Sequence, residues 1–126
     1  MVNDVVANFL TAIRNATQRS KPEVSVQTSK MIEAIAAILK EEGYITDFTV
    51  ADGKLTLTLK YVNKKPAIMH LEKVSKPGIR TYVGYNDIPK VINGMGINIF
   101  STSKGIMTGK KARNEKLGGE YICNIW

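Results

Sequence analysis

The sequence is poor in the residues on which redox, metal and acid–base chemistry depend. It has one cysteine, Cys123, and one histidine, His70, among 126 residues. A lone cysteine excludes an internal disulfide and a thiolate zinc cluster, and it fits a reducing compartment. His70 lies in a predicted strand and Cys123 alternates with apolar neighbours. We therefore expect both side chains to be structural, with no catalytic residue, no metal and no cofactor.

Long apolar runs are also absent. No stretch approaches the roughly 20 apolar residues that a membrane span requires, and the amino terminus lacks the charged and then apolar layout of a secretory signal. Hydrophobic residues nevertheless make up 44% of the chain and charged residues 23%, which is ordinary globular composition. We expect a folded protein that stays in the cytoplasm.

Positive charge is in excess and is unevenly distributed. The formal net charge is +7 and the pI is near 9.6. Residues 1–59 carry 6 Lys/Arg against 7 Asp/Glu, giving −1, whereas residues 60–126 carry 12 against 4, giving +8. Such an excess is typical of proteins that bind nucleic acid or an anionic membrane surface. We expect polyanion binding to concentrate in the second half.

The first half combines helical periodicity with a hairpin signal. Apolar residues recur at helical spacing over residues 4–16, and again from Ser29 until Gly43. Alternation over residues 54–61 and the Asp52-Gly53 pair predict a hairpin with residues 45–50. We predict a first domain over residues 1–63 with two helices on a short antiparallel sheet.

The second half is predicted to consist mainly of antiparallel strands. The predicted strands are residues 68–74, 79–85, 97–101 and 121–126. Pro77-Gly78 is typical of a turn, so the first two strands should form a hairpin. A helical turn around Pro89, a glycine-rich break at 93–96 and a short helix over 108–117 complete a basic domain over residues 64–126. The fold class is α+β, with two small packed α/β domains.

One segment carries three adjacent hydroxyl side chains between apolar pairs. It consists of Ser101, Thr102, Ser103, Lys104 and Gly105. Hydroxyl groups donate and accept hydrogen bonds, lysine adds charge, and glycine lets backbone approach a ligand closely. Such a tip suits a phosphate, a ribose or a base edge. By composition alone, a solvent-exposed Ser/Thr turn is the commoner explanation.

Four cations follow on or beside one short predicted helix. They are Lys110, Lys111, Arg113 and Lys116. Spacings of three and four place pairs of them on neighbouring surface positions, which fits a nucleic-acid footprint or a solvated helix face. Gly118 is expected to end this helix. Glu120 would repel RNA unless it pairs with a cation or accepts from a base amino group, so structural and specificity roles stay open.

Several short motifs, spread over nearly the whole chain, together match one family pattern. They are Gly94-Met95-Gly96-Ile97, residues 101–108, Ala112-Arg113, and Gly118-Gly119-Glu120 with Cys123, together with the blocks 9–16 and 39–45. The set closely resembles the bacterial type of the ribosomal protein S-eight family. Departures from the family pattern occur at Val5, Ala12 and Gly109-Lys110. None of these departures touches the hydroxyl segment.

The resemblance implies a structural component of the small ribosomal subunit, located on the ribosome in the cytoplasm, and not an enzyme. It implies early, direct binding to the central domain of small-subunit ribosomal RNA, which helps to order the platform. It also implies contacts with small-subunit proteins five and twelve and, in some bacteria, repression of the operon messenger. We expect neither a membrane nor a small-molecule substrate as partner, and a monomer off the ribosome.

We accordingly predict a set of RNA-binding residues. In the second domain they are Ser101, Thr102 and Ser103 for bases and ribose, Lys104 for phosphate, Lys110, Lys111, Arg113 and Lys116 for a diffuse footprint, and also Gly105, Gly119 and Glu120. Secondary candidates in the first domain are Arg14, Asn15, Lys30 and Lys54. Tyr82 and Tyr85 could stack on bases, but on a hairpin such side chains more often pack or are half exposed.

The sequence lacks the residues expected of three other classes of protein. An enzyme needs a nucleophile with a base or a pair of tuned carboxylates, and the glycines at 94 and 96 lack the third glycine of a phosphate-binding loop. A membrane-surface helix pairs its basic face with Trp, Phe or Leu, whereas this helix offers only Ala112 and Leu117. A DNA-binding regulator needs two helices joined by a short turn in the basic half.

Overall fold

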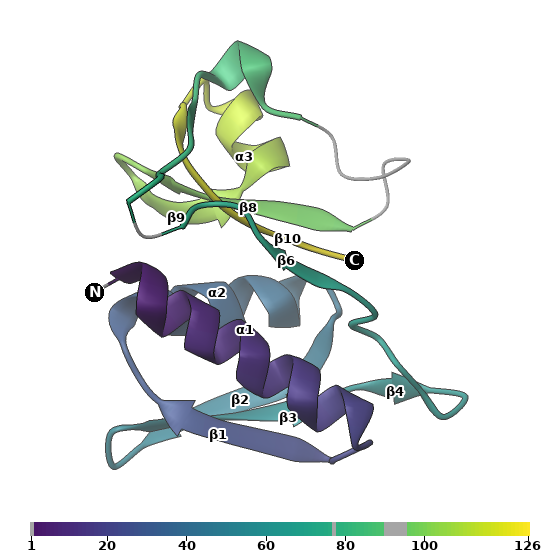
Figure 1. The fold of residues 1–126 in the computed structure, drawn as a ribbon. Helices are drawn as coiled ribbons and strands as arrows, with labels where there is room; N and C mark the ends of the chain where they lie inside the picture. Colours follow the sequence, from purple (N-terminus) through teal and green to yellow (C-terminus); the bar gives the residue numbers. More distant parts are fainter. Residues whose placement is uncertain (1, 77, 90–95) are drawn as a thin grey trace. The chain divides into compact units, whose positions relative to one another are not determined.

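The chain forms two compact units, Met1–Met69 and His70–Trp126. The computed structural model describes residues 2–76, 78–89 and 96–126. Each unit has its own sheet (Figure 1), and both combine helices with antiparallel strands. The predicted α+β class is therefore confirmed. None of the described helices is long and apolar enough to cross a membrane.

The N-terminal unit is built from helices α1 (Val2–Gln18) and α2 (Lys30–Glu41) on a three-stranded sheet. Its strands are β1 (Glu23–Gln27), β2 (Ile45–Ala51) and β3 (Lys54–Leu59), in the order β1-β3-β2. Figure 1 shows both helices on one face of this sheet. Their apolar stripes meet the inward face of β3, where Leu55, Leu57 and Leu59 are buried as their alternation predicts. The two predicted helices and the hairpin are confirmed.

Local signals fix the ends of α2 and the β2–β3 turn. The Ser29 side chain accepts a hydrogen bond from the Ile32 backbone N–H, as expected of a helix cap. Asp52 and Gly53 both have positive φ, 53° and 76°, which matches the twist of a two-residue hairpin. The sequence did not predict β1, which has only two apolar residues, Val24 and Val26, and occupies a sheet edge.

A small hairpin follows the N-terminal sheet. It pairs β4 (Tyr61–Val62) with β5 (Lys65–Pro66) through a two-residue turn, Asn63-Lys64. It lies within the stretch in which we place the domain boundary. This stretch is therefore an ordered ribbon rather than an irregular linker.

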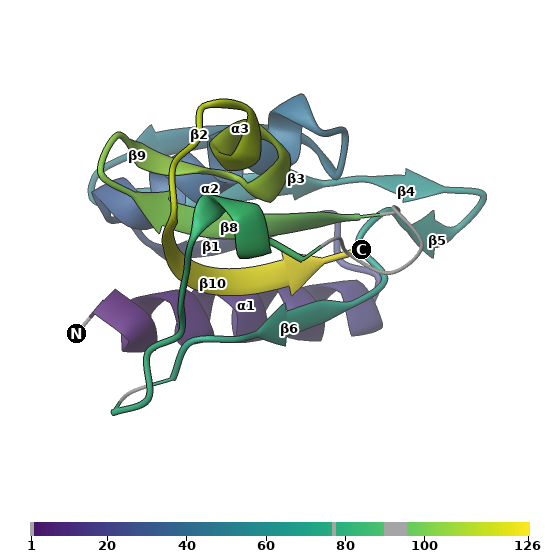
Figure 2. The ribbon, with the colours of Figure 1, turned by 90° about the horizontal axis from the view of Figure 1, so that it is seen from above.

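The C-terminal unit is arranged around one long strand, β10 (Gly119–Ile125). The other strands are β6 (Leu71–Lys73), β7 (Tyr82–Val83), β8 (Ile97–Thr102) and β9 (Gly105–Thr108). β10 pairs with β8 on one side and with β6 and β7 on the other, and Figure 2 shows it between β6 and β8. The predicted strands near 97–101 and 121–126 are confirmed.

The predicted pairing of residues 68–74 with 79–85 is wrong. β6 and β7 pair with successive parts of β10 and not with each other. Only a tight bridge joins Lys76 to Ile79, whose backbone N–H and C=O groups exchange hydrogen bonds of 3.0 Å. Buried Ser75 fixes this course, because its hydroxyl donates to the Tyr121 carbonyl at 2.7 Å and accepts from the Thr81 N–H at 3.1 Å.

Short helical elements cover one face of the C-terminal sheet. α3 (Gly109–Asn114) confirms the predicted short helix, and the 3-10 turn η1 (Tyr85–Asp87) lies just before Pro89. Beneath them lies a cluster of Ile88, Phe100, Met107 and Ala112. The Phe100 ring stacks on that of Tyr121, with centroids 4.6 Å apart. Residues 90–92 of the helical turn predicted around Pro89 lie outside the described residues. The predicted break at 93–96 also lies outside the described residues except for Gly96.

Candidate nucleic-acid interface

The hydroxyl segment forms the tip of the β8–β9 hairpin. Thr102 pairs with Gly105, which leaves Ser103 and Lys104 as a two-residue turn. Gly105 has φ 110°, a conformation that other residues rarely adopt, and an added Cβ there would meet no atom within 4 Å. Ser103, Lys104 and Gly105 are exposed. The tip is therefore open to a ligand, with glycine required by the turn itself.

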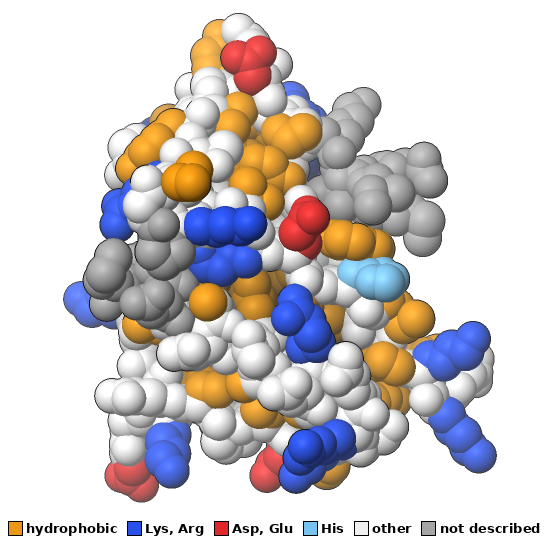
Figure 3. Space-filling model, viewed as in Figure 1, with side chains coloured by type: hydrophobic (Ala, Val, Ile, Leu, Met, Phe, Trp, Pro, Cys, Tyr) orange, Lys and Arg blue, Asp and Glu red, His pale blue; other side chains and the backbone are white. Residues whose placement is uncertain are grey.

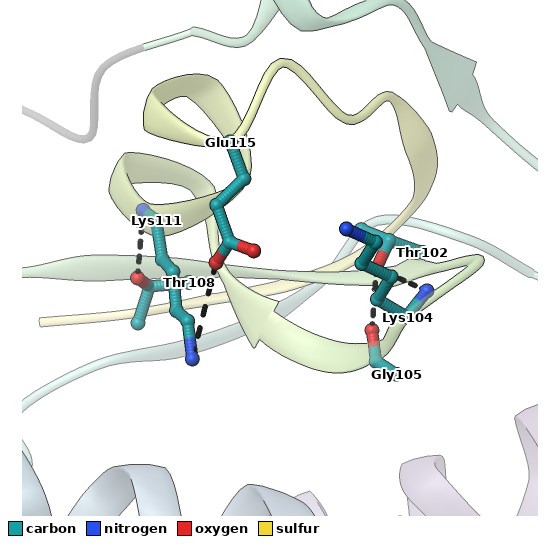
Figure 4. A network of polar contacts seen from close by, with 6 residues as sticks. All are labelled: Thr102, Lys104, Gly105, Thr108, Lys111 and Glu115. Carbon is teal, nitrogen blue, oxygen red and sulfur yellow. Dashed lines mark hydrogen bonds and ion pairs between the residues drawn. The ribbon is translucent and has the colours of Figure 1, made fainter.

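The three hydroxyl groups of the tip do not have the same role. The Thr102 hydroxyl donates to the Gly105 carbonyl at 2.8 Å and accepts from the Lys104 backbone N–H at 3.2 Å, so it holds the turn (Figure 4). Ser101 and Ser103 have no side-chain hydrogen bond to any residue that the structure describes. Their hydroxyl groups are the ones available to a partner.

Strand pairing places Glu120 directly opposite Ser101. In antiparallel pairs, opposed residues project to the same face, so one row across the sheet contains Ile106, Ser101, Glu120 and Tyr82. Glu120 is 9% exposed, and its Oε2 has no hydrogen-bond partner among the described residues. Tyr82 is 68% exposed, so it does not pack as its position on a hairpin suggested. A hydroxyl, an unpaired carboxylate oxygen and an accessible ring thus share one face.

Gly119 allows β10 to approach β8 closely at this point. A Cβ at Gly119 would lie 2.2 Å from the Ser101 carbonyl oxygen, which is backbone and cannot move aside cheaply. Gly119 therefore sets the geometry of the row rather than offering a group to a ligand. Its predicted contact with RNA stays a prediction.

The cations on and beside α3 differ in their exposure and in their contacts with other residues. Thr108 caps the helix by accepting from the Lys111 N–H at 3.2 Å (Figure 4). Lys110, Lys111 and Lys116 are exposed, and the Lys111 Nζ lies 4.0 Å from a Glu115 carboxylate oxygen. Arg113 is half-buried and donates to the Ile88 carbonyl at 2.9 Å, which ties α3 to the preceding loop. It is the cation with the clearest structural role.

The expected helix stop at Gly118 is wrong. Lys116 takes the left-handed conformation, with φ 57°, and the Leu117 N–H then donates to the Ala112 carbonyl at 2.8 Å. Gly118 serves close packing instead, because a Cβ there would lie 2.6 Å from the Val83 carbonyl oxygen.

The four candidates in the N-terminal unit do not converge on one place. Lys54 begins β3 opposite Gln27, and Lys30 begins α2 three residues later, so these two lie at the same end of the unit. Asn15 lies toward the other end, beside Arg19, Lys21 and Glu23. All four candidates, including Arg14 on α1, are exposed. They form at least two separate patches.

The lone cysteine is a core residue, as predicted. The lone histidine is exposed and immediately precedes β6, so its predicted place in a strand is wrong. The His70 ring stacks on Trp126 with centroids 5.1 Å apart, and the two backbones exchange hydrogen bonds. Cys123 is fully buried, and burial raises the pKa of its thiol to about 12 despite the opposing charge of Lys73. The described residues contain no group of three His, Cys, Asp or Glu side chains able to hold a metal ion.

Comparison with known proteins decides the family. A family model described as ribosomal protein S8 matches residues 4–126. The chain belongs to this family. It is 55% identical over 126 residues to small ribosomal subunit protein uS8 of Nitratidesulfovibrio vulgaris strain DP4, with both chains fully covered. It is 56% identical over 129 residues to the uS8 protein of Mycoplasma capricolum, again with full coverage of both chains.

Membership of the S8 family confirms several predictions. The chain is a structural, non-enzymatic protein of the small ribosomal subunit, with ribosomal RNA and ribosomal proteins as partners. The predicted location on the ribosome in the cytoplasm is confirmed with it. The uS8 protein of Dechloromonas aromatica is 52% identical over 128 residues, covering 98% of each chain, so the similarity extends through both units.

Proposed function

We propose that the chain binds the central domain of small-subunit ribosomal RNA directly, and that the β8–β9 tip is its specific contact. The observation that carries the proposal is the exposed turn with Ser103, preceded by Ser101 in β8; neither hydroxyl has a partner among the described residues. The Thr102 hydroxyl holds this turn in shape before any ligand arrives. A preformed tip loses little conformational entropy on binding.

A small tip suits structured RNA. The major groove of regular A-form RNA is too deep and narrow for side chains, so proteins read the shallow groove, the 2′-hydroxyls and irregular bases. Ser101 and Ser103 can donate to and accept from such groups, while Lys104 neutralises a phosphate. Lys110, Lys111 and Lys116 add charge beside the tip. Arg113, Lys30, Lys54, Arg14 and Asn15 are weaker candidates.

Glu120 gives the proposal a way to discriminate between bases. Its Oε2 is buried without a partner among the described residues, and the carboxylate as a whole could accept a hydrogen bond from a base amino group, which a phosphate could not offer. Tyr82, opposite Glu120 in the same row, presents an accessible ring on which a base can stack. An extruded or bulged base fits these two groups better than a paired one.

The resemblance supports further parts of the proposal. Binding at this site helps to assemble the platform of the subunit, beside proteins five and twelve. An operon messenger that copies the RNA site would be bound by the same tip and thereby repressed. Off the ribosome we expect a monomer.

The test is the double substitution Ser101→Ala with Ser103→Ala. Affinity for a central-domain RNA fragment should fall about tenfold or more, since each lost hydrogen bond to RNA contributes about 1 kcal/mol. Thermal unfolding should not change, because these hydroxyls bind no described residue. A matched control is Thr11→Ala with Thr49→Ala, which removes two exposed hydroxyls from the N-terminal unit. Equal affinity of the tip variant and the parent would remove the tip from recognition.

A further inference from the structure

A second group of cations lies in the N-terminal unit, and of the candidates assigned above only Asn15 borders it in the described residues. It consists of Arg19, Lys21, Lys60, Lys64 and Lys65, which we call the basic corner. Two hydrogen bonds join its parts. The Tyr61 hydroxyl donates to the Lys21 carbonyl at 2.5 Å, and the Leu59 N–H donates to the Pro22 carbonyl at 2.9 Å. The α1–β1 connection and the β4–β5 hairpin therefore meet at one end of the unit.

The hairpin of the basic corner has a defined backbone. Asn63 and Lys64 have φ of 53° and 66°, the conformation of a tight two-residue turn. The Ala67 N–H donates to the Lys60 carbonyl at 2.8 Å and closes the base of the ribbon. Lys65 stands opposite Val62, and Tyr61 points to the other face, where its hydroxyl bond anchors the hairpin. The lysines are flexible side chains on a fixed support.

The charge of the basic corner is uncompensated. All five cations are exposed, and none forms an ion pair with a residue that the structure describes. The sequence has no acidic residue between Asp52 and Glu72, and Glu23 lies beside Arg19 and Lys21. Arg19, Lys21 and Glu23 border a shallow hollow of about 290 Å³. Figure 3 shows Lys and Arg side chains projecting at this end of the unit.

The composition of the corner favours a nucleic acid over a protein as its partner. Interfaces between proteins are enriched in aromatic residues, Met and Arg, and are depleted in Lys. The corner has four lysines and one arginine, and the exposed apolar side chains next to them in sequence are Pro22 and Val62. Lysine ammonium groups on a ribbon suit repeated phosphates, which they neutralise without reading sequence.

We propose that the basic corner is a second RNA anchor, which binds the phosphate backbone of a segment other than the one read by the β8–β9 tip. The inference rests on the RNA-binding function proposed above and adds a site to it. Two anchors on one protein raise the overall affinity for an RNA that can reach both. The tip then selects the RNA, and the corner fixes the orientation of the N-terminal unit upon it.

Salt dependence tests the corner separately from the tip. One variant combines Lys60→Gln, Lys64→Gln and Lys65→Gln. Its affinity for a long central-domain RNA is measured at several salt concentrations. Each lost phosphate contact lowers the slope of log K against log salt by about 0.7 to 0.9, so we expect a decrease of about two or more. The control combines Lys40→Gln, Lys76→Gln and Arg80→Gln, which removes equal charge from exposed positions elsewhere. Equal slopes for the two triple variants would overturn the proposal.

A minimal RNA separates this proposal from the function on which it rests. It is the shortest fragment that retains the full effect of the Ser101 and Ser103 substitutions. The corner variant should bind this fragment like the control triple variant. If the tip substitutions have no effect on any RNA, the proposed function fails. If they do, and the corner variant matches its control on the long RNA, the second anchor alone fails.

Crosslinking identifies the class of partner. Val62→Cys places a thiol on the exposed face of the hairpin, 53% exposed in the parent, for attachment of a photoreactive group. Buried Cys123, with its pKa raised to about 12, should not react, so labelling is confined to one site. In the assembled small subunit we expect crosslinks to ribosomal RNA. Crosslinks to proteins alone would overturn the proposal in favour of an acidic protein partner.

Discussion

The two units differ in where they bury polar groups. In the described part of the N-terminal unit, every buried side chain is apolar. The three buried polar residues, Ser75, Asn98 and Glu120, all belong to the C-terminal unit. Ser75 and Asn98 make hydrogen bonds, the latter to the Pro89 carbonyl at 2.6 Å, whereas one oxygen of Glu120 has no described partner.

This difference fits the proposal that one unit is a scaffold and the other recognises RNA. Burying a polar group without a partner costs roughly 1–3 kcal/mol, so a fold keeps such a group only where something else compensates. Ser75 and Asn98 compensate within the fold by joining strands and loops. Glu120 does not, and it lies in the row of Ser101 and Tyr82, where a base could supply the missing donor. The buried polar group without a described partner thus lies in the row of the proposed site.

The largest effect is expected at Gly119, where the C-terminal sheet is packed most closely. Gly119→Ala would place a Cβ 2.2 Å from the Ser101 carbonyl oxygen and should lower the free energy of unfolding by about 3 kcal/mol. RNA binding should fall with it, because Ser101 and Glu120 would be displaced. Urea unfolding followed by circular dichroism measures the loss. Gly53→Ala in the N-terminal unit should cost less, since it meets strain from its φ of 76° but no clash.

Glu120 allows the comparison of buried polar groups to be tested directly. Glu120→Met should raise the free energy of unfolding by about 1 kcal/mol, since it removes an unpaired buried carboxylate oxygen, and should weaken specific RNA binding about tenfold. Ser75→Ala is the matched control. It should lower the free energy of unfolding by about 1–3 kcal/mol, because it leaves the Thr81 N–H without its acceptor. Thermal unfolding and RNA titration measure both. If Glu120→Met destabilises as Ser75→Ala does, Glu120 is structural after all.

The smallest effect is expected in the scaffold. Ser29→Ala removes the cap of α2 and should cost about 1 kcal/mol in the free energy of unfolding. Affinity for the minimal central-domain fragment should stay unchanged, since the tip belongs to the other unit. Chemical denaturation and filter binding check the two statements. A loss of affinity as large as that of the tip variant would end the division into scaffold and recognition unit.

Much of the N-terminal unit could be predicted because its signals are local. The spacing of apolar residues gives both helices, Ser29 gives the start of α2, and Asp52-Gly53 gives the β2–β3 turn. β1 was missed because an edge strand with two apolar residues has little pattern of its own. Its place depends on pairing with β3, about 30 residues away in sequence, which no local rule contains.

The C-terminal unit was predicted less completely because its pairings are distant. β6 and β7 look like the arms of one hairpin, but β10, some 40 to 50 residues further along, pairs with both. The hydroxyl segment and Glu120 could be chosen as candidates from residue type alone. Two features could not be predicted without the register of four strands. One is that Thr102 holds the turn while the two serines stay without described partners, and the other is the row from Ser101 to Tyr82.

The position of β10 in the chain has a consequence for synthesis. β6, β7 and β8 are translated before the strand with which all three pair. Until residues 119–125 emerge, each presents unpaired backbone groups, which are templates for aggregation. The N-terminal unit has its three main strands and both helices within the first 59 residues. A nascent chain should therefore acquire protease resistance in two steps, with the C-terminal unit protected last.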